Sequence, residues 1–187
     1  MAKTKFKDET NFTSPPLEGL GEAFSTPLGT MYACATDKGI CLLEFDNRKN
    51  LELQFKKLSG TILKEESPFF SQLRKELEEY FNKERTDFTV PLDFVGTDFQ
   101  KRVWTELVKV PHGKTVSYKQ LAKNMGDEKA VRAVANANAM NKIAVIVPCH
   151  RVIGSDGSLT GYAGGLDRKQ HLLALEGAKT DLFRKIN

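Results

Sequence analysis

The sequence predicts a protein of two domains, a small α/β domain followed by a mainly helical one. A β-hairpin pattern lies near the start, and apolar residues recur at helical spacing soon after it. The second half contains short helices with strong capping signals. A chain of 187 residues is long enough for one domain or two small ones.

The composition is that of a globular protein in a reducing compartment. Hydrophobic residues make up 40% of the chain and charged residues 28%, which excludes collagen-like and wholly disordered proteins. The longest apolar run, residues 143–148, is far shorter than the ~18 residues that span a bilayer. The N-terminus carries lysines but no apolar segment of a secretory signal. We therefore expect a cytoplasmic protein without membrane contact.

The first half predicts the α/β domain, at residues 23–91. Residues 1–22 lack apolar periodicity and are expected to form a flexible arm. Strands are expected around 31–35 and 40–45, because they flank Asp37-Lys38-Gly39, a hairpin turn signature. A helix follows with Leu51, Phe55 and Leu58 on one face, and Ser67-Pro68 opens another with Leu73, Leu77 and Phe81.

The second half predicts a helical domain at residues 92–178, followed by a tail at 179–187. Residues 97–100 form a capping box that opens one helix, and residues 117–120 form another. The helix from 118 should end at Gly126, and Asp127 can cap a further helix to about Met140. This pair has the form of a helix-turn-helix, which either docks on DNA or is an ordinary packing motif.

Charge and side-chain size are reasons to consider a polyanionic partner, such as DNA, for the second half. Residues 1–91 carry 13 Lys or Arg against 15 Asp or Glu, whereas residues 92–187 carry 15 against 9. The helix at 128–141 is rich in alanine, and Arg132 is the one long cation after its first turn. Such a helix either packs closely against a neighbour or approaches a DNA groove, where Arg132 could enter the base stack.

Cys149 is the candidate nucleophile. It follows residues 143–147, which we expect to form a buried strand, and cationic neighbours His150 and Arg151 favour a thiolate. Adjacent side chains on a strand point to opposite faces, so a contact between Cys149 and His150 would need a turn or a bridging water. An inert buried thiol is the alternative. Cys34 and Cys41 are expected to be buried thiols, and the three histidines do not cluster with them, so no metal site is predicted.

Several motifs together resemble the O6-alkylguanine-DNA alkyltransferases, also called methylated-DNA–protein-cysteine methyltransferases. They cover roughly residues 97–177. The motifs are PCHR at 148–151, SDGSLTGYAGG at 155–165, SYKQLA at 117–122, RAV at 132–134, Asn141, and ALEG at 174–177. The resemblance implies a ribonuclease H-like N-terminal domain and a winged helix-turn-helix-like DNA-binding region in the C-terminal domain.

The resemblance also implies roles for individual residues. Cys149 would accept the alkyl group once and irreversibly, with His150 acting through a water as its base and Glu176 orienting the histidine. Asn141 would hold the turn around the cysteine, and Tyr118 would donate a proton to N3 of the departing guanine. No cofactor or metal is implied.

DNA contacts follow from the same resemblance. The partner would be double-stranded DNA containing O6-alkylguanine, with O4-alkylthymine as a second candidate substrate, bound by a monomer. Arg132 would fill the space left by the flipped nucleotide while its helix lies in the minor groove. The helix residues expected to contact DNA are Ala130, Arg132, Ala133, Ala135 and Asn136, and the residues expected to wall the base pocket are Val152, Ser155, Tyr162 and Gly164.

Two departures from the family pattern affect the pocket floor and the groove contact. Lys142 stands where a proline is expected after the asparagine, and Ala135-Asn136 stands where glycine is common. Three other functions were weighed. A non-catalytic DNA-binding relative would lack Cys149, a helix-turn-helix regulator would leave PCHR unused, and a Cys-His hydrolase would not need the helix pair and would turn over repeatedly.

Overall fold

The protein, as a computed structural model, is described over residues 21–49, 51–58 and 67–178. It divides into two compact units, Met1–Asp93 and Phe94–Asn187. The expected tail at 179–187 and all but the last two residues of the expected arm at 1–22 lie outside the described residues. No helix in the described ranges is long and apolar enough to cross a membrane.

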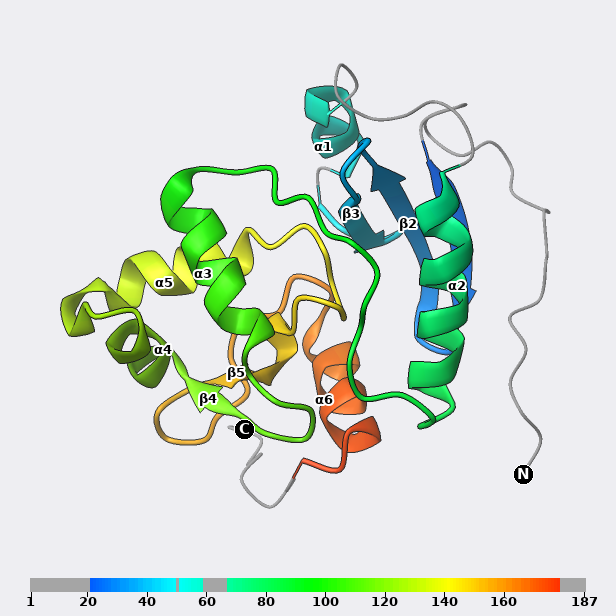
Figure 1. Cartoon of the computed structure of the whole chain (residues 1–187). Helices are drawn as coiled ribbons and strands as arrows, with labels where there is room; N and C mark the ends of the chain where they lie inside the picture. Colours follow the sequence, from blue (N-terminus) through cyan, green and yellow to red (C-terminus); the bar gives the residue numbers. More distant parts are fainter. Residues whose placement is uncertain (1–20, 50, 59–66, 179–187) are drawn as a thin grey trace. The chain divides into compact units, whose positions relative to one another are not determined.

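The N-terminal unit contains a three-stranded antiparallel sheet (Figure 1). Its strands are β1 (Glu22–Thr26), β2 (Gly29–Ala35) and β3 (Ile40–Phe45), in that spatial order. The predicted hairpin of β2 and β3 is confirmed. Gly39 has φ +155°, and a Cβ there would lie 2.4 Å from the Pro91 carbonyl oxygen. The turn therefore needs glycine both for its backbone and for this close approach.

Strand β1 was not predicted, and its first residue falls inside the expected arm. It pairs along its whole length with β2, and Phe24 lies opposite Met31 in the register. Phe24 is its only large apolar residue, so its periodicity is too weak to stand out from a loop. Tertiary packing stabilises the strand instead, because Phe24 is fully buried against the ring of Phe70.

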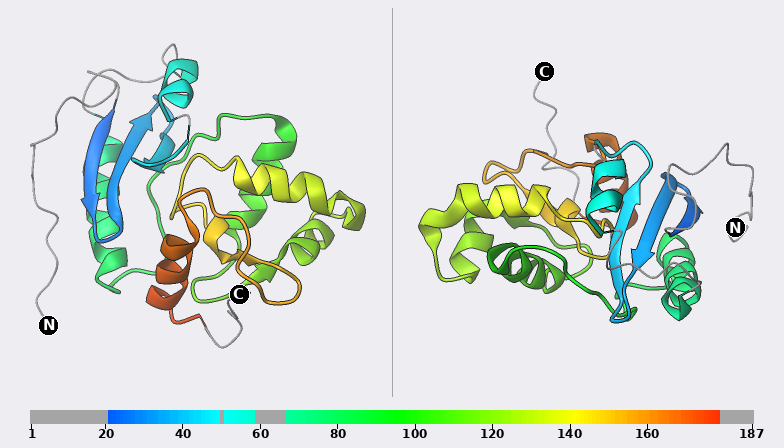
Figure 2. Two further views of the ribbon diagram at one scale, coloured as in Figure 1. Left: turned by 180° about the vertical axis from the view of Figure 1, so that it is seen from behind. Right: turned by 90° about the horizontal axis from the view of Figure 1, so that it is seen from above.

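Both predicted helices of the N-terminal unit are confirmed. Helix α1 (Leu51–Leu58) buries the three predicted apolar residues. Helix α2 (Pro68–Phe81) begins at Pro68, with the Ser67 hydroxyl accepting a hydrogen bond from the Phe69 amide. Helix α2 lies along the sheet face that carries Phe24 (Figure 2).

The C-terminal unit is mainly helical. Helix α3 (Asp98–Val108) begins with the complete predicted capping box of Thr97 and Gln100. Helix α4 (Tyr118–Asn124) follows Ser117, whose hydroxyl caps the Gln120 amide. Asp127 caps the 3₁₀ helix η1 (Glu128–Ala130), which continues into α5 (Val131–Ala139). Helices α4 and α5, joined through Gly126 at φ +84°, form the predicted helix-turn-helix pair.

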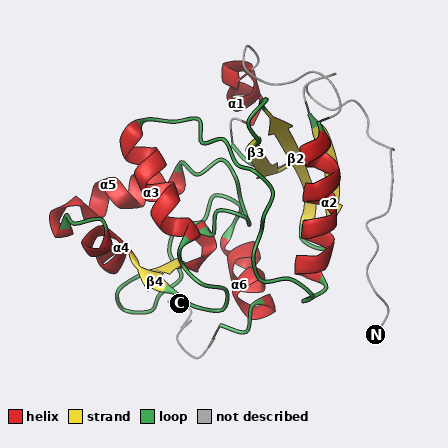
Figure 3. Ribbon diagram, viewed as in Figure 1, coloured by secondary structure: helices red, strands yellow, loops and turns green. Residues whose placement is uncertain are grey.

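The predicted buried strand at residues 143–147 is wrong. The residues are buried, but they form turns, and the segment that follows α5 is a loop (Figure 3). Val145 has φ +70°, a conformation that a β-branched residue rarely adopts and that no strand contains. The remaining elements are η2 (Cys149–Arg151), the short parallel pair β4 (Val116–Ser117) and β5 (Val152–Ile153), and α6 (Leu166–Leu175).

Glu76 of α2 is expected to stabilise the N-terminal unit in a pH-dependent way. Its carboxylate accepts hydrogen bonds from Gln72, from the amide and hydroxyl of Thr89, and from the Val90 amide. Burial acts to raise the pKa of Glu76, but these hydrogen bonds outweigh it and lower the pKa. The stabilisation is therefore complete above the ordinary carboxyl pKa of about 4.3 and is lost as the pH falls through the lower pKa of the folded state.

Glu76→Gln should accordingly lower the free energy of unfolding by ~1–3 kcal/mol at neutral pH, because at least one amide loses its acceptor. Urea unfolding of the wild type, Glu76→Gln and the half-buried control Glu78→Gln, at pH 7 and at acid pH, measures this. A difference that is absent at pH 7, or that grows toward acid pH, would contradict the assignment.

Candidate functional site

Cys149 begins a tight turn rather than ending a strand. It is the first residue of η2, directly after Pro148, and its side chain is buried. In a 3₁₀ turn, neighbouring side chains do not alternate between two faces as they do on a strand. Cys149 and His150 are therefore not forced onto opposite faces, and both can belong to one site.

The side chain of Asn141 holds the turn that carries the cysteine. Its Nδ2 lies 3.3 Å from the Ile143 carbonyl oxygen, 3.0 Å from that of Val147 and 3.2 Å from Cys149 Sγ. Its Oδ1 accepts a hydrogen bond of 3.0 Å from the Ile143 amide. A donor directed at the sulfur stabilises the thiolate form. Asn141 thus shapes the loop and touches the candidate nucleophile.

His150 and Glu176 form a buried pair. His150 Nε2 lies 2.7 Å from Glu176 Oε1, and both side chains are inaccessible to solvent. Burial lowers the pKa of His150 despite the nearby carboxylate, so the ring is neutral at physiological pH. Because a carboxylate only accepts, Nε2 is assigned as the protonated nitrogen. Nδ1 is then an acceptor, and it is buried without a protein hydrogen-bond partner.

Arg151 and a backbone amide complete the surroundings of Glu176. The guanidinium forms a bidentate pair, with Nε 2.9 Å from Oε2 and Nη2 3.0 Å from Oε1. The Gly113 amide also donates to Oε2 at 3.1 Å. Burial acts to raise the pKa of Glu176, but His150 and Arg151 hold it well below its usual range. Glu176 is therefore a fixed negative charge beside His150.

Lys169 is a site residue that the sequence did not indicate. Its side chain is fully buried, and Nζ donates to the carbonyl oxygens of Val152 at 2.5 Å and Thr160 at 2.7 Å. Burial lowers the pKa of Lys169 to about 8, and the charge of Cys149 opposes this shift. A lysine on a helix is usually exposed, so the local pattern carried no signal for this position.

The predicted pocket residues lie at different depths. Val152 and Gly164 are buried, Tyr162 is half-buried and Ser155 is exposed. The Tyr162 and His150 rings are 6.5 Å apart, edge to face. Tyr118, at the start of α4, is half-buried, and burial is the main cause that raises its pKa, with a smaller contribution from Cys149. These two tyrosines thus lie toward the cysteine, while Ser155 lies on the surface.

Helix α5 presents one face to solvent. Val134, Ala137 and Asn138 are buried. Of the predicted DNA-contacting residues, Arg132, Ala133 and Asn136 are exposed, and Ala130 and Ala135 are half-buried. The outward face therefore combines small side chains with one long cation.

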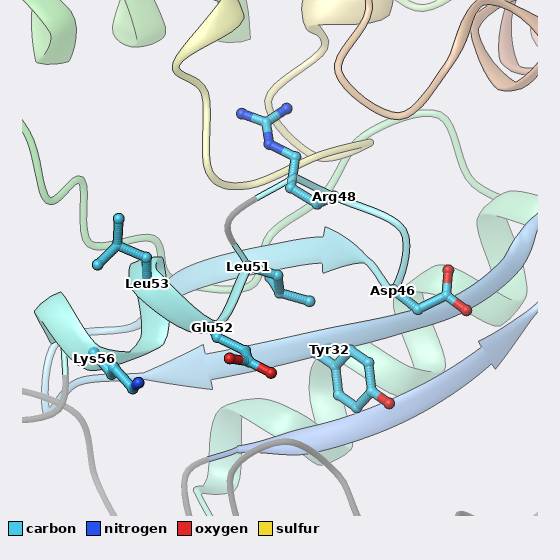
Figure 4. A pocket seen from close by; sticks show the side chains of 7 residues that line it. All are labelled: Tyr32, Asp46, Arg48, Leu51, Glu52, Leu53 and Lys56. Carbon is cyan, nitrogen blue, oxygen red and sulfur yellow. The ribbon is translucent and has the colours of Figure 1, made fainter.

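A separate pocket of about 540 Å³ lies on the N-terminal unit, beside α1 (Figure 4). None of the predicted site residues lines it; the lining residues are Tyr32, Asp46, Arg48, Leu51, Glu52, Leu53 and Lys56. Cys34 and Cys41 are buried thiols outside any disulfide, in the β2–β3 hairpin, as predicted. Among the described residues, no three His, Cys, Asp or Glu side chains gather as a metal site would require.

Comparison with known proteins identifies both units. Residues 22–94 match the ribonuclease-like domain of 6-O-methylguanine DNA methyltransferase, and residues 98–178 match its DNA-binding domain. A methylated-DNA–protein-cysteine methyltransferase of Methanosarcina acetivorans is 44% identical over 156 residues, which cover 83% of this chain and 96% of that protein. A Methanosarcina barkeri protein of the same name is 42% identical over 156 residues, with 83% and 95% covered.

Solved structures agree with these matches. The O6-methylguanine methyltransferase of Mycobacterium tuberculosis is 39% identical, with a TM-score of 0.73, covering 84% of this chain and 92% of that one. The Mycobacterium tuberculosis OGT in complex with DNA is 38% identical, with a TM-score of 0.70 and 86% and 95% covered. The chain belongs to the methylated-DNA–protein-cysteine methyltransferases, DNA repair proteins that transfer the methyl group of O6-methylguanine to a cysteine of their own.

Proposed function

We propose that Cys149 is the acceptor and that each molecule acts once. The thiolate attacks the alkyl carbon on guanine O6, a carbon–sulfur bond forms, and the carbon–oxygen bond breaks with its electrons moving into the guanine ring. The observation that carries this assignment is the contact of 3.2 Å between Asn141 Nδ2 and Cys149 Sγ, beside the His150–Glu176 pair. The resulting thioether is chemically stable to the acids and bases described around Cys149, so the step is irreversible.

His150 is proposed as the base that removes the thiol proton. Its neutral state and its Nδ1 acceptor support this role, and in this proposal a water carries the proton from Cys149 to the ring. Glu176 is a positioning residue, because it fixes the ring orientation and the tautomer through Nε2. The negative charge of Glu176 also stabilises the imidazolium that forms on proton transfer.

Tyr118 is proposed to donate its proton to N3 of the departing guanine. Electrons that arrive in the ring need a proton there, and a neutral phenol supplies one. The raised pKa of Tyr118 keeps the hydroxyl protonated before the reaction. The walls of the base pocket are proposed to include Val152, Ser155, Tyr162 and Gly164.

Double-stranded DNA containing O6-alkylguanine is the proposed partner, with O4-alkylthymine as a second candidate. Guanine O6 lies inside the duplex, so the nucleotide must be flipped out before a buried thiol can reach it. The exposed, small-residue face of α5 suits the minor groove, and Arg132 is long enough to fill the stack. All groups named here come from one chain, so we propose a monomer. Its reduced thiols suit the reducing cytoplasm that we propose as its location.

Stoichiometric transfer is the first expected outcome. With excess O6-methylguanine duplex, intact mass should rise by about 14 Da on Cys149 and then stop. Cys149→Ser should keep DNA affinity and lose transfer, because a serine hydroxyl is not ionised at neutral pH. Repeated turnover would favour a hydrolase, and a methyl group on Cys34 or Cys41 would refute the assignment of the acceptor.

Arg132→Ala is expected to slow transfer more in duplex than in single-stranded DNA, where no stack has to be refilled. Single-turnover rates on both substrates test this. Lys129→Ala, which removes an exposed cation from the neighbouring turn η1, is the matched control. It should lower the transfer rate by the same factor on both substrates. Equal losses for Arg132→Ala on the two substrates would argue against insertion of the arginine.

Glu176→Gln should reduce both transfer and stability. Removing one partner of a buried ion pair costs ~3–5 kcal/mol, because the charge of Arg151 remains buried. The lowered pKa of Glu176 means that its contribution is complete above about pH 4.3 and is lost in acid. Thermal melts of wild type, Glu176→Gln and the exposed control Glu128→Gln across pH measure this. An unchanged melting temperature at pH 7 would contradict it.

A further inference from the structure

Lys142 occupies the position where the sequence departs from the family pattern, and it makes a specific contact there. Its Nζ donates a hydrogen bond of 2.8 Å to the carbonyl oxygen of Val95, and its side chain is half-buried. Val95 lies in the connector that precedes α3, 47 residues earlier in the chain. The lysine thus joins the outside of the cysteine turn to a distant segment.

The connector around Val95 is a fixed anchor. The Phe94 ring contacts the Trp104 ring edge to face, with centroids 5.8 Å apart. Gly96 lies so close to Trp104 that a Cβ there would be 2.6 Å from the indole ring. Thr97 then caps α3. Since both neighbours of Val95 are packed against a buried tryptophan, its carbonyl has little freedom to move.

The same tryptophan holds the other end of the turn. Trp104 Nε1 donates to the Ala137 carbonyl oxygen of α5 at 2.8 Å. The backbone amide of Asn141 donates a hydrogen bond of 3.2 Å to the Asn138 carbonyl oxygen. These contacts form a ring. Trp104 holds the end of α5, α5 leads into the turn, and Lys142 ties the turn to Val95, which lies beside Trp104.

The turn needs such a closed path because it is strained. Val145 is fully buried at φ +70°, and conformations of this kind persist only where the surrounding structure over-determines them. Asn141 holds the turn from within, through the Ile143 and Val147 carbonyl groups. Without a second attachment on the outer side, the turn could relax and carry Cys149 Sγ away from the Asn141 donor.

We infer that Lys142 is a positioning residue for the alkyl transfer: its hydrogen bond to Val95 keeps the strained turn in the form that places Cys149 against Asn141. This inference rests on the proposed role of Cys149. The contact that carries it is the hydrogen bond from Lys142 to Val95, which acts on the sulfur through the geometry of the turn.

The test compares Lys142→Met, which keeps the length of the side chain but cannot donate, with Lys142→Arg, which can. Lys101→Met, at an exposed position of α3, is the control for loss of one positive charge. Iodoacetamide alkylation of Cys149 is followed by peptide mass against pH, which requires no DNA. Methyl transfer from O6-methylguanine duplex is measured in parallel on all four proteins, the wild type included.

In Lys142→Met, Cys149 should react with iodoacetamide and accept the methyl group about tenfold more slowly at pH 7, since small misplacements of reacting groups have large kinetic effects. Its alkylation profile should move to higher pH as the thiolate loses its donor. Lys142→Arg should recover most of the rate, and Lys101→Met should match the wild type. None of the variants replaces a titratable or charged group of the site: Tyr118 and Lys169 act on Cys149, His150 and Arg151 follow it in the chain, and Glu176 pairs with His150.

An unchanged alkylation profile and transfer rate in Lys142→Met would overturn the inference. A wild type that alkylates normally but accepts no methyl group would instead overturn the proposed function. Trp104 fluorescence reports whether each variant is folded. If Lys142→Met does not fold, Lys142→Gln replaces it, and a normal profile in that shorter variant would equally overturn the inference.

Discussion

The site depends on one buried group, the side-chain amide of Asn141. Residues 143–147 are as apolar as a core strand, yet the Asn141 side chain satisfies backbone groups of this segment that would otherwise pair in a sheet. The loop can therefore be buried without a neighbouring strand, because its polar groups have partners. One consequence is the strained backbone of Val145, and another is a cysteine held against an amide donor.

Burial of charge explains why His150 can act as a base. A neutral imidazole beside a lone carboxylate would tend to become protonated, but Arg151 already compensates Glu176 through two hydrogen bonds. Burial and the nearby cations lower the pKa of His150 further. Lys169 places a second buried cation near Cys149, which favours the thiolate. The arrangement thus keeps the histidine neutral while it stabilises negative charge on sulfur.

Local signals were sufficient for much of the fold and insufficient for the site. The backbone conformation of Gly39 and the cap of Ser67 act within a few residues, so the hairpin and the start of α2 could be predicted from short patterns, whereas the approach of Gly39 to Pro91 could not. Strand β1 has only Phe24 to indicate it, and its pairing is a long-range effect. The apolar run around Val145 matches a strand in composition, and a side chain from outside the run decides its conformation. Lys169 looked like a surface residue because its carbonyl partners are brought to it by the tertiary fold.

Helix α5 links the surface proposed to face DNA to the proposed acceptor cysteine. Its outward face carries Arg132 at one end, and its last residue, Ala139, lies about 10 Å further along at the rise of an α-helix, shortly before Asn141. Trp104 fixes the helix near that second end, at the Ala137 carbonyl. In the proposed complex, a groove contact at Arg132 and the position of Cys149 Sγ are therefore set by one rigid element. The flipped guanine then meets the sulfur in a geometry fixed before binding, which lowers the entropic part of the barrier without any loop closure.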